Sequence, residues 1–258
     1  MNVYWVEHSL SDVPIHDDWL AKSELRRLEQ LRIAKRRDDW RLGRWTAKRA
    51  VAIVLGLPVD DTPLTTIEIL AGSSGAPEVY VGHQLASASI SLSHRDGVAA
   101  CAITQSTIPL GCDLELIETR SDAFVGDYFT ATEQAFIATQ RRSERDRLVT
   151  LLWSEKESAL KALRVGLRAD TRSVVINLGV GHPQRDEQHF RNGSDAFSLC
   201  RSPEEWHSFQ AVLESDQVLY GWWNTYGSLV RTFATLQAAK PPIFVSRDAL
   251  LSTTPSHS

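Results

Sequence analysis

Two carboxylates stand two positions apart in a short apolar segment, Leu-Gly-Cys-Asp-Leu-Glu-Leu at residues 110–116. Side chains two apart on a β-strand project from the same face, so we expect Asp113 and Glu115 to lie side by side. The residues that alternate with them are expected to face the core: Cys112, Leu114 and Leu116. Neighbouring carboxylates repel each other, and a bound Mg²⁺ ion shared with substrate phosphates removes that penalty. The pattern therefore predicts a magnesium site, with a solvent-facing polar stripe as the alternative.

A second set of chemically active side chains lies on a predicted helix at residues 151–161, Leu-Leu-Trp-Ser-Glu-Lys-Glu-Ser-Ala-Leu-Lys. Helical spacing places Trp153, Glu157 and Lys161 along one side of this helix. Glu157 could complete the metal site, and Lys156 and Lys161 could neutralise a diphosphate. The alternative is an ordinary pair of opposite charges one turn apart, which stabilises a helix by only about 0.2–0.5 kcal/mol.

A third group closes a predicted strand at residues 89–97, Ser-Ile-Ser-Leu-Ser-His-Arg-Asp-Gly. The hydroxyl of Ser93, the imidazole of His94 and the N–H groups of the following turn can all bond phosphate oxygens. A hydrolase triad is less suited, because triad residues come from separated segments and the chain has no Gly-x-Ser-x-Gly nucleophile elbow. A structural capping role for His94 is the other alternative.

The elements that must position these groups occur in two similar blocks. The first has a strand, a long helix and four further strands, at residues 3–6, 19–55, 66–70, 77–81, 87–92 and 98–103. After a linker at 105–109, the second has a strand at 112–117, a helix opened by a capping box at Thr130 and Glu133, a helix at 145–167, and strands at 173–178, 196–200, 206–213 and 218–223. This order predicts an α+β fold with an N-terminal half at 1–108, a C-terminal half at 109–235 and a tail at 236–258. We expect the last ten residues of the tail to fray.

The distribution of charge points to an anionic partner. The segment from Lys22 to Arg49 carries eleven Lys and Arg against four Asp and Glu, whereas the whole chain has a net charge of −4. Phosphates, an acidic protein or nucleic acid would suit this segment, and a solvated helix face is the alternative. Trp40 and Trp45 interleave with the cations, but the pI of about 6.1 and the lack of a recognised motif disfavour nucleic acid.

The cysteines and the hydropathy of the sequence indicate in which cellular environment the protein works. Cys101, Cys112 and Cys200 are too few and too scattered for a disulfide framework or a zinc site, so we expect buried small apolar residues. The sequence shows no signal-peptide pattern and no apolar stretch long enough to span a membrane. We therefore expect a cytoplasmic protein that does not enter a membrane.

Taken together, these segments resemble the signature blocks of the surfactin-type 4′-phosphopantetheinyl transferases. The matching blocks are Arg41-Leu-Gly-Arg44, Gly75-Ala-Pro77, Ser93-His94, Gly111-Cys-Asp113-Leu-Glu115, Phe129 with Glu133, Trp153-Ser-Glu-Lys156-Glu157-Ser-Ala-Leu-Lys161 and, more weakly, Gly221-Trp-Trp223. The joint match in order and spacing is more specific than any single block, and it covers most of the chain.

The resemblance implies two similar α+β halves related by a pseudo-twofold axis, with coenzyme A and Mg²⁺, which Mn²⁺ could replace, in the cleft between them. It also implies roles for individual residues. Asp113, Glu115 and Glu157 would bind the metal, Lys161 and Lys156 the diphosphate, Ser93 and His94 phosphate oxygens, and Arg44 the 3′-phosphate of coenzyme A, with Glu133 as a positioning residue.

The implied reaction transfers 4′-phosphopantetheine from coenzyme A to a serine of an apo acyl, polyketide or peptidyl carrier protein and releases 3′,5′-ADP. Asp113, Glu157 and Lys161 are the expected catalytic residues, with Glu157 as base, directly or through a water molecule on the metal. A monomer would be sufficient, because both halves lie in one chain. The alternatives are a nucleic-acid-binding module and an inactive relative that only binds carriers or coenzyme A.

Two cations typical of the family are missing from this sequence. Ala76 stands where many members have lysine, and no arginine occurs a few positions earlier, in the segment 69–74. We therefore expect Arg44, with help from Arg41 or Lys48, to hold the 3′-phosphate.

Overall fold

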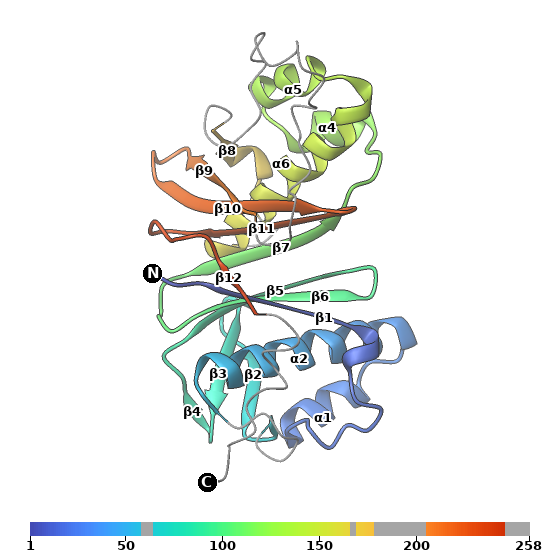
Figure 1. The fold of residues 1–258 in the computed structure, drawn as a ribbon, viewed down its shortest axis with the longest axis vertical. Helices are drawn as coiled ribbons and strands as arrows, with labels where there is room; N and C mark the ends of the chain where they lie inside the picture. Colours follow the sequence, from blue (N-terminus) through green and yellow to red (C-terminus); the bar gives the residue numbers. More distant parts are fainter. Residues whose placement is uncertain (58–63, 166–168, 178–204, 246–258) are drawn as a thin grey trace. The chain divides into compact units, whose positions relative to one another are not determined.

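The computed structural model describes residues 1–57, 64–165, 169–177 and 205–245 (Figure 1). The chain divides into two compact units, one formed by residues 1–108 with the described residues from Pro242 onward, the other by residues 109–241. Both units combine helices with largely antiparallel sheets, so the predicted α+β class is confirmed. The predicted strand at 196–200, Cys200 and the last ten residues lie outside the described part.

The first unit holds a four-stranded and a three-stranded sheet, in the orders β12-β1-β6-β5 and β2-β3-β4. Its elements are β1 (Tyr4–Ser9), η1 (Leu10–Asp12), α1 (Lys22–Glu29), α2 (Ala34–Val54), β2 (Ile67–Ala71), β3 (Pro77–Val81), β4 (Gln84–Leu85), β5 (Ser89–Arg95), β6 (Val98–Thr104) and β12 (Ile243–Phe244). The predicted turn after Arg95 is confirmed: Asp96 and Gly97 both have positive φ, which suits an Asp-Gly hairpin. Part of the predicted tail forms β12, which pairs in parallel with β1.

The single helix predicted at 19–55 is wrong, because the chain forms two helices there. The guanidinium of Arg37 donates to the carbonyls of Leu28 and Leu31, which closes the end of α1. In one continuous helix, Glu24 and Lys48 would be about 36 Å apart. The break instead lets α1 pack on α2, and the two side chains form an ion pair.

The second unit is a five-stranded sheet, in the order β7-β11-β10-β9-β8, with a long helix against it. Its elements are β7 (Leu110–Leu116), α4 (Asp122–Tyr128), α5 (Ala131–Ala138), α6 (Arg142–Ala162), η3 (Thr171–Ser173), β8 (Val174–Ile176), β9 (His207–Leu213), β10 (Val218–Tyr226) and β11 (Leu229–Thr235). The capping box at Thr130 and Glu133 is present at the start of α5. The sequence did not predict α4 or β11, and α6 ends at Ala162, before the predicted end at 167.

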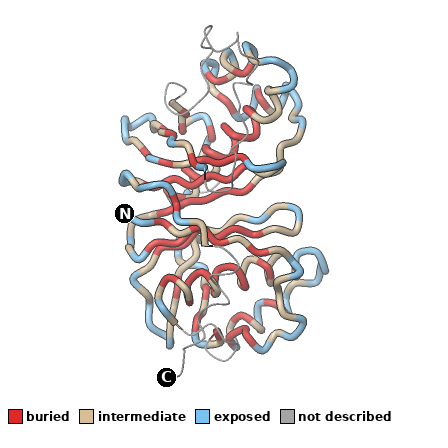
Figure 2. Tube along the Cα trace, in the orientation of Figure 1, coloured by how far each residue is buried: buried red, intermediate tan, exposed pale blue. Residues whose placement is uncertain are grey.

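The helix α6 packs closely on β7 and β11, and its buried apolar residues belong to the hydrophobic core of this unit. Figure 2 shows the buried residues in red. At Gly111 a Cβ atom would come within 1.9 Å of the carbonyl oxygen of Ser158, so glycine is needed for this approach. Because α6 covers this face of β7, the side chains of Asp113 and Glu115 point toward the helix.

The orientation predicted for β7 is therefore wrong: the face that carries Asp113 and Glu115 packs on α6, and the face that carries Cys112 and Leu114 points away from it. Cys112 and Leu114 are buried, but they are not part of the hydrophobic core around α6. The expectation that the cysteines are buried is confirmed for Cys101 and Cys112.

Candidate active site

The carboxylate of Asp113 is the centre of a polar network between β7 and α6. Its Oδ1 lies 2.7 Å from the ammonium of Lys161, which also donates to the carbonyl of Cys112 at 3.0 Å. Its Oδ2 accepts from the hydroxyl of Ser154 at 2.9 Å. Both carboxylate oxygens therefore bond side chains of α6, as a buried charge requires, since Asp113 is only 4% exposed.

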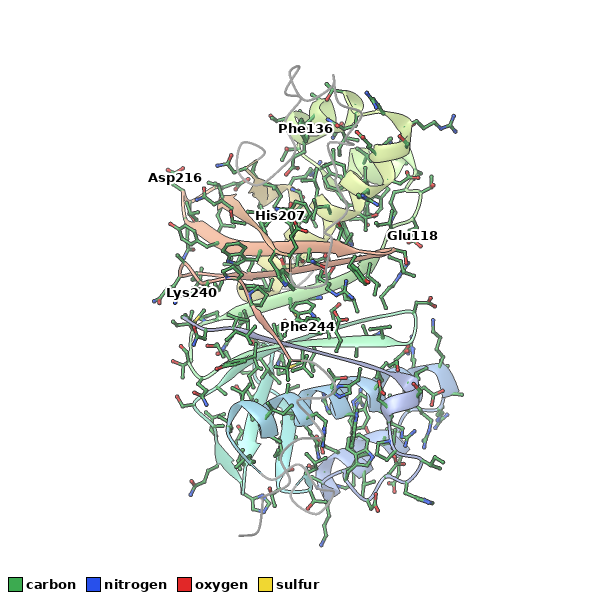
Figure 3. All side chains as sticks on the ribbon, viewed as in Figure 1. Glu118, Phe136, His207, Asp216, Lys240 and Phe244 are labelled. Atoms are coloured by element: carbon green, nitrogen blue, oxygen red, sulfur yellow. The ribbon has the colours of Figure 1, made fainter. Side chains whose placement is uncertain are left out.

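Glu115 follows on the same face, held by two further donors. The indole N–H of Trp153 donates to its Oε1 at 3.3 Å, and Arg120 approaches its Oε2 at 3.5 Å. Arg120 also pairs at 2.9 Å with Glu118, which is labelled in Figure 3 just beyond the end of β7. The prediction that Asp113 and Glu115 share a face with Glu157 nearby agrees with this arrangement.

Glu157 is the least compensated carboxylate of the group. Burial, and then the negative charge of Asp113, raise its pKa from 4.5 to about 7, against a lowering by Lys161. Its Oε1 is buried and has no hydrogen-bond partner. A carboxyl group in this state favours either a proton or a cation.

Lys161 remains a cation within the network. Burial acts to lower its pKa, but the charge of Asp113 and the hydrogen bond between the two groups outweigh it, so the pKa is raised. Its side chain keeps 27% exposure.

The three carboxylates fit a divalent cation by their chemistry, because hard cations take oxygen ligands and the orphaned oxygen of Glu157 needs positive charge. Within the described ranges, however, no three His, Cys, Asp or Glu side chains are grouped so as to hold a metal ion. Asp113 uses its two oxygens for Lys161 and Ser154. A bound cation would therefore have to replace at least part of this network.

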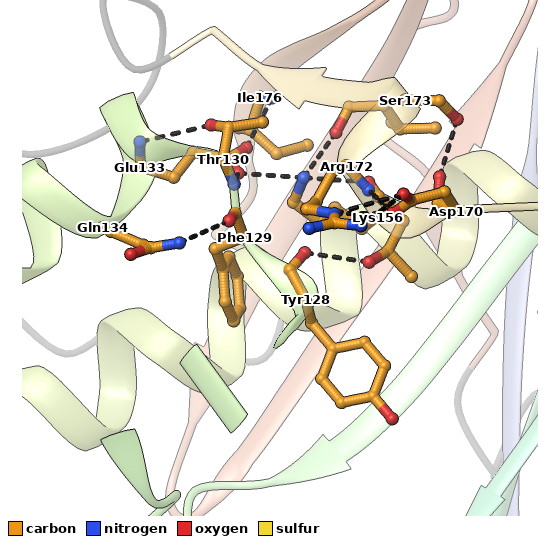
Figure 4. Close-up of polar contacts among 12 residues, drawn as sticks. Tyr128, Phe129, Thr130, Glu133, Gln134, Lys156, Asp170, Arg172, Ser173 and Ile176 are labelled. Carbon is orange, nitrogen blue, oxygen red and sulfur yellow. Dashed lines mark hydrogen bonds and ion pairs between the residues drawn. The ribbon is translucent and has the colours of Figure 1, made fainter. Parts of the chain in front are cut away.

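Lys156 does not have the position expected of a diphosphate contact, and this prediction is corrected. Its side chain is fully buried, and its ammonium pairs with Glu133 at 2.9 Å and donates to the carbonyls of Thr171 and Val174 (Figure 4). Glu133 in turn accepts from the backbone N–H groups of Thr130 and Ile176. Since an ammonium has three donors, none is left for a substrate phosphate.

The first unit repeats the same contact pattern around Lys48. Its fully buried ammonium pairs with Glu24 at 2.5 Å and donates to the carbonyls of Trp19 and Leu64, each at 3.0 Å. Glu24 accepts from the backbone N–H groups of Ala21 and Ile69. The prediction that Lys48 assists the 3′-phosphate is corrected for the same reason as that for Lys156.

The other predicted phosphate contacts all lie in the first unit. Arg44 stacks on Trp40, with 4.9 Å from its guanidinium carbon to the ring centroid, and lies 3.8 Å from Glu24. Arg41 pairs with Asp17 at 2.7 Å. Ser93 and His94 are on β5, with His94 exposed. Their roles toward coenzyme A stay predictions.

Sequence reasoning missed three residues that hold the carboxylates. Ser154 lies inside a motif that was recognised, but its neighbour Thr232 is 78 positions away on a strand that was not predicted. Arg120 follows β7 in a segment with no recognisable pattern. Only the folded sheet brings these residues to Asp113 and Glu115.

Residues 109–185 match the family model of the 4′-phosphopantetheinyl transferase superfamily. The match begins at β7 and contains Asp113, Glu115, Glu157 and Lys161, so it supports this superfamily, though not a particular subfamily within it. A search of curated proteins found no match to the chain. In the part of the chain that the structure describes, no helix is long and apolar enough to cross a membrane.

Proposed function

We propose that the protein is a surfactin-type 4′-phosphopantetheinyl transferase, which moves 4′-phosphopantetheine from coenzyme A to a serine of an apo acyl, polyketide or peptidyl carrier protein and releases 3′,5′-ADP. The observation that carries the proposal is the set of three coupled carboxylates beside Lys161, inside the segment that matches the superfamily. Asp113, Glu115 and Glu157 would hold the cation. Mg²⁺, when bound, screens negative charge on a diphosphate and orients it.

The residues of the chain suit the remaining steps. Lys161, oriented by Asp113, supplies positive charge for the diphosphate and for the departing 3′,5′-ADP. Glu157, one turn before Lys161 on α6, would take the proton of the attacking serine as the general base.

We also propose that the two units are similar halves related by a pseudo-twofold axis, as in the family that the sequence resembles. Support comes from the repeated contact pattern of Lys48 with Glu24 and Lys156 with Glu133. In addition, α2 and α6 both have 21 residues, and each buried lysine occurs at the same position within its helix. A cytoplasmic location and a monomeric state remain part of this proposal.

The variant Asp113→Ala tests the assignment of the carboxylates. We expect almost no transfer to an apo carrier protein and a weaker apparent affinity for Mg²⁺, because one cation ligand and the partner of Lys161 are lost. Glu214→Ala is the control: it removes an exposed carboxylate in the turn between β9 and β10, and transfer should be unchanged. Normal transfer by Asp113→Ala at limiting Mg²⁺ would show that the metal assignment is wrong.

A further inference from the structure

Two buried hydroxyl groups, on α6 and β11, meet behind the carboxylate of Asp113. The Oγ of Ser154 lies 2.9 Å from Oδ2 of Asp113 and 2.9 Å from Oγ1 of Thr232. Thr232 also donates to the backbone carbonyl of Ser154 at 2.8 Å. Both hydroxyl residues are fully buried, and Thr232 is directly opposite Asp113 in the strand pairing of β11 with β7.

The number of hydrogens sets the direction of these bonds. Each hydroxyl has one hydrogen to donate, and a carboxylate can only accept. Because a charged acceptor makes the stronger bond, Ser154 donates its hydrogen to Asp113. Thr232 then donates its own hydrogen to Ser154, where the hydroxyl oxygen and the backbone carbonyl are both within reach. The pair therefore directs a donor at Oδ2 while Lys161 holds Oδ1.

Two other buried hydroxyls on the long helices, those of Ser158 and Thr46, bond within their own helix. Ser158, one turn further along α6, donates to the carbonyl of Glu155 at 2.9 Å. Thr46 lies two residues before Lys48, as Ser154 lies two residues before Lys156, and donates to the carbonyl of Leu42 at 2.9 Å. Ser154 instead bonds a residue 41 positions away. Its orientation is therefore a consequence of Asp113 and Thr232, not of helix geometry.

We propose that Ser154 and Thr232 are positioning residues that fix the Asp113 carboxylate for cation binding. The proposal rests on the proposed function, because it assigns their purpose to the same site. Ligating carboxylates are commonly oriented by such outer partners, and losing one typically weakens metal affinity about 10- to 100-fold.

The test measures cation affinity directly, without turnover. Mn²⁺ serves as the probe, and its binding to the full chain is followed by electron paramagnetic resonance. We expect Ser154→Ala to weaken Mn²⁺ binding about 10- to 100-fold. Ser158→Ala, which removes a buried hydroxyl from the same helix, should leave it unchanged. A Ser154→Ala variant that is folded by circular dichroism and binds Mn²⁺ like the wild type would overturn the proposal.

Thr232 provides a second pair of variants that separates positioning from packing. Thr232→Val keeps the shape and loses the hydroxyl, whereas Thr232→Ser keeps the hydroxyl and loses a methyl group. We expect weaker Mn²⁺ binding in the valine variant and near wild-type binding in the serine variant; the reverse order would mean that the residue only packs. Asp113→Ala separates a failure of the cation site from a failure of the positioning role. If Asp113→Ala also binds Mn²⁺ normally, the proposed cation site is wrong. If Asp113→Ala loses Mn²⁺ binding while the Ser154 and Thr232 variants keep it, only the role of Ser154 and Thr232 is wrong.

Discussion

Replacement of Lys156 by methionine separates a structural lysine from a catalytic one. The substitution leaves the carboxylate of Glu133 fully buried without its counter-ion, and the carbonyls of Thr171 and Val174 lose the ammonium as a donor. Removing one partner of a buried ion pair costs about 3–5 kcal/mol, a large share of the roughly 5–15 kcal/mol that stabilises a typical domain. With a urea dependence of about 3 kcal/mol per molar, the unfolding midpoint should fall by about 1–2 M.

The assay is urea unfolding followed by far-ultraviolet circular dichroism, with transfer measured under conditions where each variant is folded. Lys161→Met, on the same helix, is the comparison: it too removes the counter-ion of a buried carboxylate, that of Asp113, but the lysine side chain is 27% exposed, so we expect a smaller loss of stability than in Lys156→Met and a large loss of transfer. Lys156→Met should show the opposite pattern. The double variant Lys156→Met/Glu133→Gln should recover part of the loss, because no charge is left buried but glutamine can accept only one of the two backbone N–H groups that Glu133 binds. A Lys156→Met variant that is as stable as the wild type but transfers nothing would refute the reasoning, and it would indicate that Lys156 contacts the substrate.

Two further predictions concern Glu157 and Arg44. Because the pKa of Glu157 is raised to about 7 in the folded chain, the metal-free protein should lose stability as pH rises from about 4.5 to 7. After allowance for its partial exposure, Glu157→Gln should be more stable than the wild type by about 1–2 kcal/mol at pH 8 and equally stable near pH 4, as measured by urea unfolding with a chelator present; an equal difference at both pH values would contradict the assignment. Arg44→Ala should raise the KM for coenzyme A by roughly 10- to 100-fold, the effect of one lost charge-assisted contact, and that for dephospho-coenzyme A much less. If the KM rises equally for both donors, Arg44 does not bind the 3′-phosphate, and its contacts with Trp40 and Glu24 are structural.

The sequence predicted the acidic and basic residues of the site because their spacing is local. Asp113 and Glu115 are two apart on one strand, and Glu157 and Lys161 are one turn apart on one helix, so each pair shares a face whatever the rest of the fold does. Which face of β7 meets the helix could not be read in the same way. The alternation of polar and apolar residues gave the reversed answer, because both faces of this strand are largely buried.

The roles of the lysines depended on contacts that no local pattern contains. Lys156 and Lys161 look alike in the sequence, but Lys156 is directed to Glu133 in α5, whereas Lys161 is directed to Asp113. Lys48 belongs to a basic segment of the sequence, but the break between α1 and α2 brings Glu24 next to it, and the two side chains form an ion pair. These are long-range consequences of how the helices end and pack.

The central claim is the transfer of phosphopantetheine, and the most direct test is the mass of the carrier protein. The pure wild-type chain is incubated with several apo carrier proteins, coenzyme A and Mg²⁺, and each carrier is analysed by intact-mass spectrometry, with 3′,5′-ADP quantified in the same samples. We predict that at least one carrier gains the mass of a single phosphopantetheine group, with an equal amount of 3′,5′-ADP released, and that a chelator abolishes both. A folded protein that adds no phosphopantetheine to any of the carriers would contradict the account.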